Sequence, residues 1–304
     1  MNKTGLRIAE ILVILLVVIV AGVLGLNAVG NARFRAREAG NRTICASHLK
    51  QWATVLAMYA EESKGGLYPP VRTAPTVNFE MDLNLLYPQY LSDFSIVACP
   101  SDVEAPPPAM DLKSLPADVR CRVLAGLNQS YAYLGWVFDR MEDVPDQCLT
   151  VEKLPPTLAV ISNGPLHTPT TAVPERERRV CGQMALTLEQ AICRSDAADV
   201  DVPLDPPSGN RGGTTVYRLR KGVERMLSTD SNTPPGQLAK LAAGIPVMLD
   251  SFTDSPTFSM FMHMPGGSNV LFLDGHVEFR RYPDQSPVNR PVGNLLNILS
   301  IIKG

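Results

Sequence analysis

Two histidines and three carboxylates near the end of the chain are of the types that hold a metal ion in hydrolases. They are Asp250, His263, Asp274, His276 and Glu278. In such enzymes these groups bind a cation that activates a water molecule. Their spacing fits no diagnostic metal motif, and the sequence contains no nucleophile elbow, P-loop or zinc-protease helix. We therefore predict that the protein is not an enzyme, and we keep a metal-dependent hydrolase as an alternative.

Six cysteines are the other chemically reactive side chains, and none of them belongs to a Cys-x-x-Cys pair. A structural zinc knuckle is therefore not expected. An even number of cysteines permits disulfides in an oxidising compartment, although the sequence cannot give their pairing. As candidate pairs we name Cys45 with Cys99, and Cys181 with Cys193.

A β-hairpin is predicted at 269–279, where Asp274-Gly275 separates two apolar alternations. This pair tolerates the positive φ that both central positions of a two-residue turn require. Such a turn places Leu273 opposite His276. One face of the hairpin, which we expect to pack on a helix, would then carry Val270, Phe272, Val277 and Phe279.

The elements that must position these side chains begin with an apolar run, Ile11–Val29, in which only Asn27 has a polar side chain. At about 1.5 Å per residue this helix covers about 28 Å, close to the thickness of a bilayer core. A membrane span is therefore predicted. A removed signal peptide is the less favoured alternative, because the run exceeds a usual h-region and no clear cleavage site closes it.

After the span, helical periodicity continues without proline until Tyr68-Pro69-Pro70. Lys64-Gly65-Gly66 is expected to end the helix. His48 lies beside the apolar stripe and is expected on the helix surface. The stripe, spaced for packing a helix on a sheet, consists of Cys45, Leu49, Trp52, Leu56 and Tyr59.

Glu10 stands at the edge of the apolar run, where an unpaired carboxylate would cost a few kcal/mol inside lipid. Gly5, an apolar Leu6, and Glu10 at the fifth position after the glycine together resemble the N-terminus of type IV prepilins and pseudopilins. The resemblance implies cleavage after Gly5 by a prepilin peptidase, and methylation of the new amino terminus at Leu6. It also implies that Glu10 neutralises the amine of a neighbouring subunit when the helices bundle.

Further segments are similar, in the same order, to large bacterial pilin-like proteins with a C-terminal "H-x9-DG" motif, which are abundant in planctomycetes. In this chain ten residues, not nine, separate His263 from Asp274. The matching segments are Cys45–Gln51, Tyr68–Pro70, Ala98–Asp102, Ser130–Gly135, Gly212–Leu227 and Ile245–Asp250.

The resemblance implies an α+β, type IV pilin-like fold, in which a long N-terminal transmembrane helix packs on an antiparallel β-sheet head. Calcium stabilises the C-terminal loops of several pseudopilins, and here Asp250 and Asp254 are the candidate carboxylates. The implied parts are a leader at 1–5, a transmembrane segment at 6–30, a continued helix at 31–66, and a head at 67–304 with a variable insertion at about 139–213.

Within the insertion we expect loops, a short helix around Met184–Arg194 and a strand at Leu158–Ile161. The basic segment Val216–Leu227 is interpreted as a solvated face, because it lacks aromatic interleaving. With a net charge of −2, nucleic acid is not an expected partner. The stretch Asn294–Lys303 is too short to span a membrane and is expected to pack on the head.

Function follows from the resemblance: a pseudopilin-like structural subunit of a type II secretion or type IV pilus-like fibre. Its expected partners are prepilin peptidase, other pilin-like subunits and membrane lipid. The resemblance places a single span in the cytoplasmic (inner) membrane with the head on the extracytoplasmic, periplasmic side. Counting Lys and Arg places the arginine-rich side Arg33–Arg42 in the cytoplasm instead. An unprocessed, membrane-anchored binding module is a further alternative.

Overall fold

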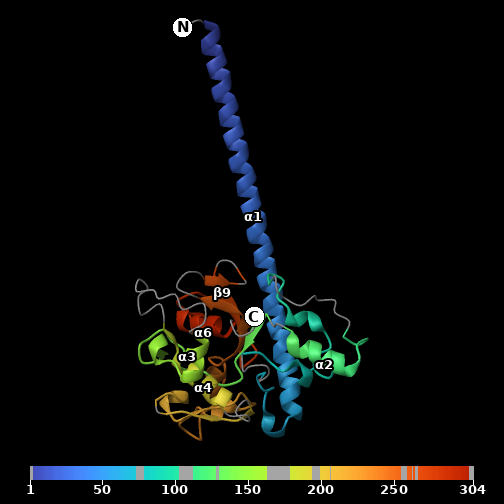
Figure 1. Cartoon of the computed structure of the whole chain (residues 1–304), viewed down its shortest axis with the longest axis vertical. Coiled ribbons are helices and arrows are strands. Elements are labelled where there is room, and N and C mark those ends of the chain that lie inside the picture. Colours follow the sequence, from blue (N-terminus) through green and yellow to red (C-terminus); the bar gives the residue numbers. More distant parts are fainter. Residues whose placement is uncertain are drawn as a thin grey trace.

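A computed structural model describes residues 3–72, 79–102, 112–127, 130–162, 179–193, 199–205, 207–254, 259–261, 263 and 266–300. The protein consists of one very long N-terminal helix and a mixed head gathered around the far end of that helix (Figure 1). All strand pairs between the described residues are antiparallel. The α+β class predicted from the sequence is therefore confirmed.

The long helix, α1, extends over 60 residues, Lys3–Glu62, or about 90 Å. It continues without interruption through Gly40. After it, Gly65 and Gly66 adopt left-handed backbone with φ of 79° and 66°, which only glycine reaches without strain. Within the described residues α1 is the one helix long and apolar enough to cross a membrane.

Four strands form the central sheet in the order β1-β6-β9-β10. They are β1 (Tyr131–Tyr133), β6 (Pro246–Asp250), β9 (Gly267–Phe272) and β10 (Val277–Arg281). Three two-stranded ribbons surround it: β2 (Cys148–Leu149) with β3 (Val180–Cys181), β4 (Val202–Pro203) with β5 (Thr215–Val216), and β7 (Phe252–Asp254) with β8 (Ser259–Phe261).

Five shorter helices complete the described part of the head: α2 (Ala117–Gly126), α3 (Pro156–Ser162), α4 (Gly182–Cys193), α5 (Pro235–Ala242) and α6 (Arg290–Ser300). Single 3₁₀ turns link them: η1 (Lys64–Gly66), η2 (Leu83–Leu85), η3 (Phe94–Val97), η4 (Val151–Lys153), η7 (Asn210–Gly212) and η8 (Val223–Arg225). The predicted terminal segment is α6, which packs against β7 and β3.

The predicted hairpin exists, but its register differs from the prediction by one residue. Val277 lies opposite Leu271, and Phe272 N–H donates to His276 C=O at 3.0 Å, so the loop has three residues. Gly275 occupies the left-handed region with φ 86°, as a type I turn followed by a G1 bulge requires. The two-residue turn was therefore wrong.

The one-residue shift also changes which side chains share a face. Val277 and Phe279 stand with Leu271 and Asn269, and not with Val270 and Phe272. This face meets α1 at Arg42, whose guanidinium stacks 4.6 Å from the Phe279 ring centre. The Arg42 carbonyl accepts a 3.2 Å hydrogen bond from Asn269 Nδ2.

The predicted apolar stripe of α1 is confirmed as the contact surface. Cys45, Leu49, Trp52 and Leu56 are each at most 1% exposed, and the fifth member, Tyr59, is partly buried against the core. Trp52 Nε1 donates to the Ile96 carbonyl at 2.9 Å, which fixes the helix against η3. The stripe thus joins the head's continuous apolar core.

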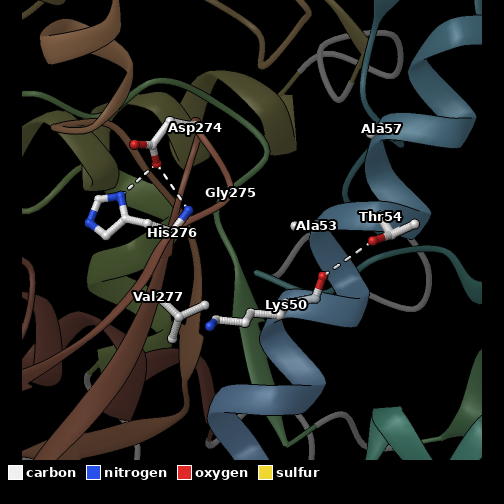
Figure 2. Close-up of a pocket in the computed structure, with 8 residues that line it drawn as sticks. All are labelled: Lys50, Ala53, Thr54, Ala57, Asp274, Gly275, His276 and Val277. Carbon is white, nitrogen blue, oxygen red and sulfur yellow. Dashed lines mark hydrogen bonds and ion pairs between the residues drawn. The ribbon is translucent and has the colours of Figure 1, made fainter.

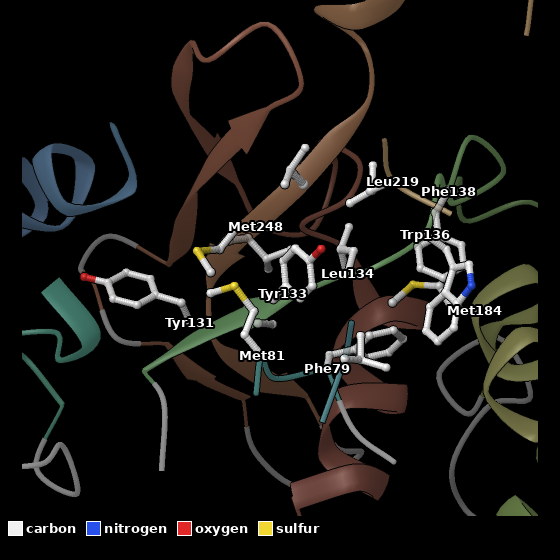
Figure 3. Packing of buried hydrophobic residues seen from close by; sticks show 14 of the residues in the cluster. Phe79, Met81, Tyr131, Tyr133, Leu134, Trp136, Phe138, Met184, Leu219 and Met248 are labelled. Carbon is white, nitrogen blue, oxygen red and sulfur yellow. The ribbon is translucent and has the colours of Figure 1, made fainter. Parts of the chain in front are cut away.

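Deeper in the head, aromatic and methionine side chains from β1, the segment after it and α4 pack together (Figure 3). Phe79 and Phe138 meet edge to face, with ring centres 6.0 Å apart. Tyr133 is fully buried and donates through its hydroxyl to the Pro69 carbonyl at 2.8 Å. The core therefore ties the segment after α1 to the central sheet.

The segment 139–213 packs on the head through α4, which confirms the helix expected at 184–194. Gln183 is buried there, and its Oε1 accepts from the backbone N–H groups of Asp139 and Arg140 at 3.0 and 3.2 Å. The strand expected at Leu158–Ile161 was wrong, because this stretch is α3. Pro156 at the first helical position is preset for helical φ.

The basic segment Val216–Leu227 is a solvated face only in part, since Lys221 and Arg225 are exposed. Arg218 is fully buried, and its guanidinium donates to the Gly135 and Tyr68 carbonyls at 2.6 and 2.9 Å and pairs with Asp199. Lys221 pairs with Glu61 of α1. Arg218 therefore stabilises the head from within, whereas the exposed pair of Lys221 and Glu61 contributes little.

Candidate functional site

The candidate side chains from the C-terminal region separate into two places. Asp274 and His276 lie at the hairpin turn, partly exposed, whereas Asp250 and His263 are both fully buried. Within the described residues, His263 shares no common metal-sized cluster with Asp274 and His276. The convergence that a hydrolase of this design requires is therefore not observed.

At the turn, Asp274 Oδ1 lies 2.6 Å from His276 Nδ1 and accepts from the His276 backbone N–H at 3.1 Å. The imidazole stacks on Phe272 with ring centres 4.5 Å apart. Both side chains thus help to hold the turn in place. Asp274 was assigned to the turn from sequence, and this role is confirmed.

A surface pocket of about 720 Å³ lies between this turn and α1 (Figure 2). Ala53 and Ala57 of α1 line it, and Lys50 extends from the helix toward Val277. The small alanines allow close approach, since a Cβ added to Gly275 would lie 4.0 Å from that of Ala53. The pocket offers an amine and a paired imidazole, but no nucleophile next to a free base.

The second place is a buried cluster where α1 enters the head, comprising Cys45, Cys99, His263 and Asp250. Cys45 comes from α1, Cys99 follows η3, Asp250 ends β6, and His263 precedes β9. The sulfur atoms of Cys45 and Cys99 are 2.9 Å apart, and His263 Nε2 lies 3.6 Å from Cys99 Sγ. All four side chains are at most 1% exposed.

Asp250 holds its place through two hydrogen bonds to one oxygen. Oδ2 accepts from the Asn269 backbone N–H at 2.9 Å and from Asn269 Nδ2 at 2.7 Å, and lies 3.3 Å from His263 Nε2. The other oxygen, Oδ1, is buried and has no hydrogen-bond partner among the residues that the structure describes. A buried carboxylate oxygen left unpaired costs roughly 1–3 kcal/mol or more.

His263 is also only half satisfied. Its Nδ1 makes no hydrogen bond with the described residues, and it lies 4.0 Å from Glu38 Oε2 of α1. Glu38 in turn accepts from the Ser101 hydroxyl at 3.0 Å, in the loop that carries Cys99. The histidine is therefore placed between a carboxylate on one ring nitrogen and the sulfur cluster on the other.

The four groups shift one another's protonation. The Cys45 thiol, followed by the nearby His263, lowers the pKa of Cys99 to about 6. Burial lowers the pKa of His263, but hydrogen bonds with Asp250 and Cys99 outweigh it and raise the pKa to about 9. The hydrogen bond to Cys99 and burial raise the pKa of Cys45. The two sulfur atoms therefore differ, and Cys99 loses its proton more readily than Cys45.

Of the candidate cysteine pairs, the structure brings Cys45 and Cys99 together as neighbouring thiols. The pair Cys181 with Cys193 was wrong, because these residues stand at opposite ends of α4, about 18 Å apart by helical rise, beyond the reach of a disulfide. The residue opposite Cys181 is Cys148, across the ribbon of β2 and β3.

The remaining predicted site residues lie at the N-terminus and at β7. Gly5, Leu6 and Glu10 belong to the first turns of α1, whose side chains through residue 12 are outside the described part. The side chain of Asp254 is also outside it. In the described part of the chain, Asp250 Oδ2 lies 3.3 Å from His263 Nε2, whereas calcium takes a ring of oxygen ligands.

The sequence did not predict that Cys45, Cys99 and His263 lie together. It suggested only a candidate disulfide between the two cysteines. His48 was also misplaced: it is half-buried and shares a 3.1 Å hydrogen bond with the Tyr131 hydroxyl. A cysteine on the buried stripe of α1 was the available signal, since a burial pattern can be read from the helical period.

Comparison of the chain with protein-family models, with curated proteins and with solved structures gives no match.

Proposed function

We propose that this protein is a pseudopilin-like structural subunit, anchored by α1 in the cytoplasmic membrane and assembled with other subunits through that helix. The observation that carries the proposal is the projecting half of α1. Every side chain from residue 13 to residue 37 is exposed in the single chain. Leu16, Leu24 and Leu26 are 61%, 64% and 76% exposed.

An apolar helix of this kind is unstable in water on its own. Burial of apolar surface contributes roughly 25 cal/mol per Å², so the projecting half requires lipid or apolar helices around it. Among the described residues this half of the helix leaves the head and does not fold back onto it (Figure 1). Membrane insertion followed by helix bundling satisfies this requirement.

The N-terminal residues supply the register of the bundle. Cleavage after Gly5 would free an amine at Leu6, and Glu10 of a neighbouring subunit would neutralise it. In an apolar bundle an unpaired charge costs several kcal/mol, so one register of neighbouring helices is favoured. The head, fixed to the lower half of α1, would then be carried outside the bilayer on each subunit.

The rival function, a membrane-anchored hydrolase, is disfavoured by the location of the candidate groups. Asp250 and His263 have no exposed surface on which a substrate could dock, and the exposed His276 is paired with Asp274. An unprocessed binding module would keep the span but would not depend on Glu10.

The test is assembly in cells, measured by photo-crosslinking from an unnatural amino acid at Leu16. The unaltered chain should give ladders of crosslinked subunits. Glu10→Ala should reduce them more than tenfold, because the amine of each neighbour loses its partner. Glu10→Asp keeps the charge and should retain part of the ladder.

Val13→Ala is the matched control, because it trims an exposed side chain on the same part of the helix and carries no charge. Its ladder should equal that of the unaltered chain. Unchanged ladders in Glu10→Ala, with Val13→Ala also unchanged, would contradict the proposal and favour the unprocessed anchor.

A further inference from the structure

We propose that Cys45, Cys99 and His263 bind one zinc ion, with the Asp250 carboxylate next to the His263 ligand, and that this ion fastens α1 to the head. The proposal does not depend on the function of the projecting helix. It concerns only the buried cluster at the point where α1 enters the head.

The donor atoms are of the right kind and close enough together. Cys45 Sγ, Cys99 Sγ and a ring nitrogen of His263 all lie within 4.8 Å of one another. Two thiolates and an imidazole are the usual ligands of tetrahedral zinc, with bonds of about 2.0–2.3 Å. Such bonds place neighbouring ligands about 3.3–3.8 Å apart, so the 3.6 Å between His263 Nε2 and Cys99 Sγ fits directly.

The sulfur pair must open slightly to accept the ion, because Cys45 and Cys99 Sγ are 2.9 Å apart. Cys45 and Cys99 would bind as thiolates and His263 through a deprotonated Nε2, so binding releases every proton on these three ligand atoms to solvent and replaces the contact of Nε2 with Asp250 Oδ2. Calcium and magnesium are excluded by the chemistry of the donors, since these hard cations take oxygen ligands.

The surrounding carboxylates match a cation at the centre. Asp250 is fully buried, and within the described part of the chain its Oδ1 has no partner, although Oδ2 accepts from Asn269. Oδ2 lies 3.3 Å from the same His263 nitrogen that faces the thiols. A zinc ion would offset the charge of this buried carboxylate.

The other ring nitrogen of His263 faces Glu38 at 4.0 Å. A metal-bound histidine commonly directs its second nitrogen at a carboxylate, which fixes the tautomer and raises the basicity of the ligating nitrogen. Glu38 and Cys45 both belong to α1, so the helix would supply one ligand and also orient another.

A disulfide between Cys45 and Cys99 is the competing state. It would consume the two thiols but would leave a buried carboxylate and a buried histidine around a neutral bond. A zinc ion uses all of these groups. It would also join positions 45, 99 and 263, closing long loops that are costly to order without a link.

The test uses the full chain, extracted in detergent from cells grown with ordinary trace zinc, with thiols blocked at lysis so that their state is preserved. Metal analysis should find one zinc per chain. Cys99→Ser and His263→Phe should each lower zinc content at least tenfold. Cys148→Ser should leave it unchanged, because that half-buried thiol lies elsewhere, on β2.

Because a ligand variant could fail to fold, His263→Cys provides a second measurement. It replaces one zinc ligand by another and should retain zinc, with cobalt substitution giving thiolate-to-cobalt absorption in the near ultraviolet. A disulfide between Cys45 and Cys99 in the extracted chain, or zinc content that does not differ between the unaltered chain and Cys99→Ser, would overturn the proposal.

Discussion

The two halves of α1 form one continuous helix, but one half projects away from the head and the other packs against it. Residues 13–37 are exposed throughout, whereas the half from Glu38 to Glu62 buries a stripe against η3 and the central sheet. From residue 13 to Val29 the upper half is apolar on every side except at Asn27, whereas the lower half is apolar on one face only. Both halves are helical, so they differ in what must cover their apolar side chains. The upper half requires lipid or other helices, and the lower half packs on its own head.

The largest expected effect is a loss of head stability when a buried side chain of the lower half is removed. Trp52→Ala removes a side chain that is 1% exposed and its hydrogen bond to Ile96. We expect a loss of about 3–5 kcal/mol in the free energy of unfolding of the head, measured by denaturant titration in detergent.

Met58→Ala is its control on the same half, since Met58 is 43% exposed. Leu16→Ala is the control on the upper half. Both should change the free energy of unfolding by no more than about 0.5 kcal/mol. A comparable loss from Leu16→Ala would mean that the upper half packs on its own head, and would remove the distinction.

A charge in the upper half should impair membrane insertion without affecting the stability of the head. Val18→Lys places a charge near the middle of the apolar run, where a lysine costs roughly 2.5–3.5 kcal/mol on insertion scales. Membrane insertion should fall, as measured by resistance to alkaline extraction, while head unfolding in detergent stays unchanged. If Val18→Lys inserts as well as the unaltered chain, this half of the helix does not lie in lipid.

The smallest effect is a pH dependence on the lower half. Burial lowers the pKa of His48 below its ordinary 6.5. The unfolded chain therefore binds more protons, and the His48 contribution to stability, complete above that value, is lost as the pH falls through 6.5 toward the folded pKa.

His48→Gln lacks this titration. As the pH is lowered from about 8 to about 5, the unfolding free energy of the unaltered chain should therefore fall relative to that of His48→Gln. The comparison isolates His48, because every other group titrates in both proteins. A difference independent of pH would mean that His48 is equally protonated in both states.

Much of the fold could be predicted from periodicity, because long helices and their buried faces depend on local spacing. The stripe from Cys45 to Leu56 was predicted in this way. The hairpin register could not be, since Asp274-Gly275 suits a two-residue turn as well as a three-residue loop with Gly275 left-handed. Only the pairing of Val277 with Leu271 distinguishes them.

The buried cluster was harder to predict from the sequence than the hairpin register. Cys45, Cys99 and His263 are separated by 54 and 164 positions along the chain. No local spacing connects them, and only the packing of α1 against η3 and the sheet does so. Burial of Arg218 was hidden for the same reason, because its partners Gly135 and Tyr68 are distant in sequence.

The central claim is that α1 begins as a processed, pilin-like terminus. Mass spectrometry of the intact chain, purified from a host that contains prepilin peptidase, tests it most directly. We predict a mature chain that begins at Leu6, without residues 1–5, and carries a methyl group on its new amine. A chain that retains Met1, or one cleaved beyond residue 30, would contradict the account.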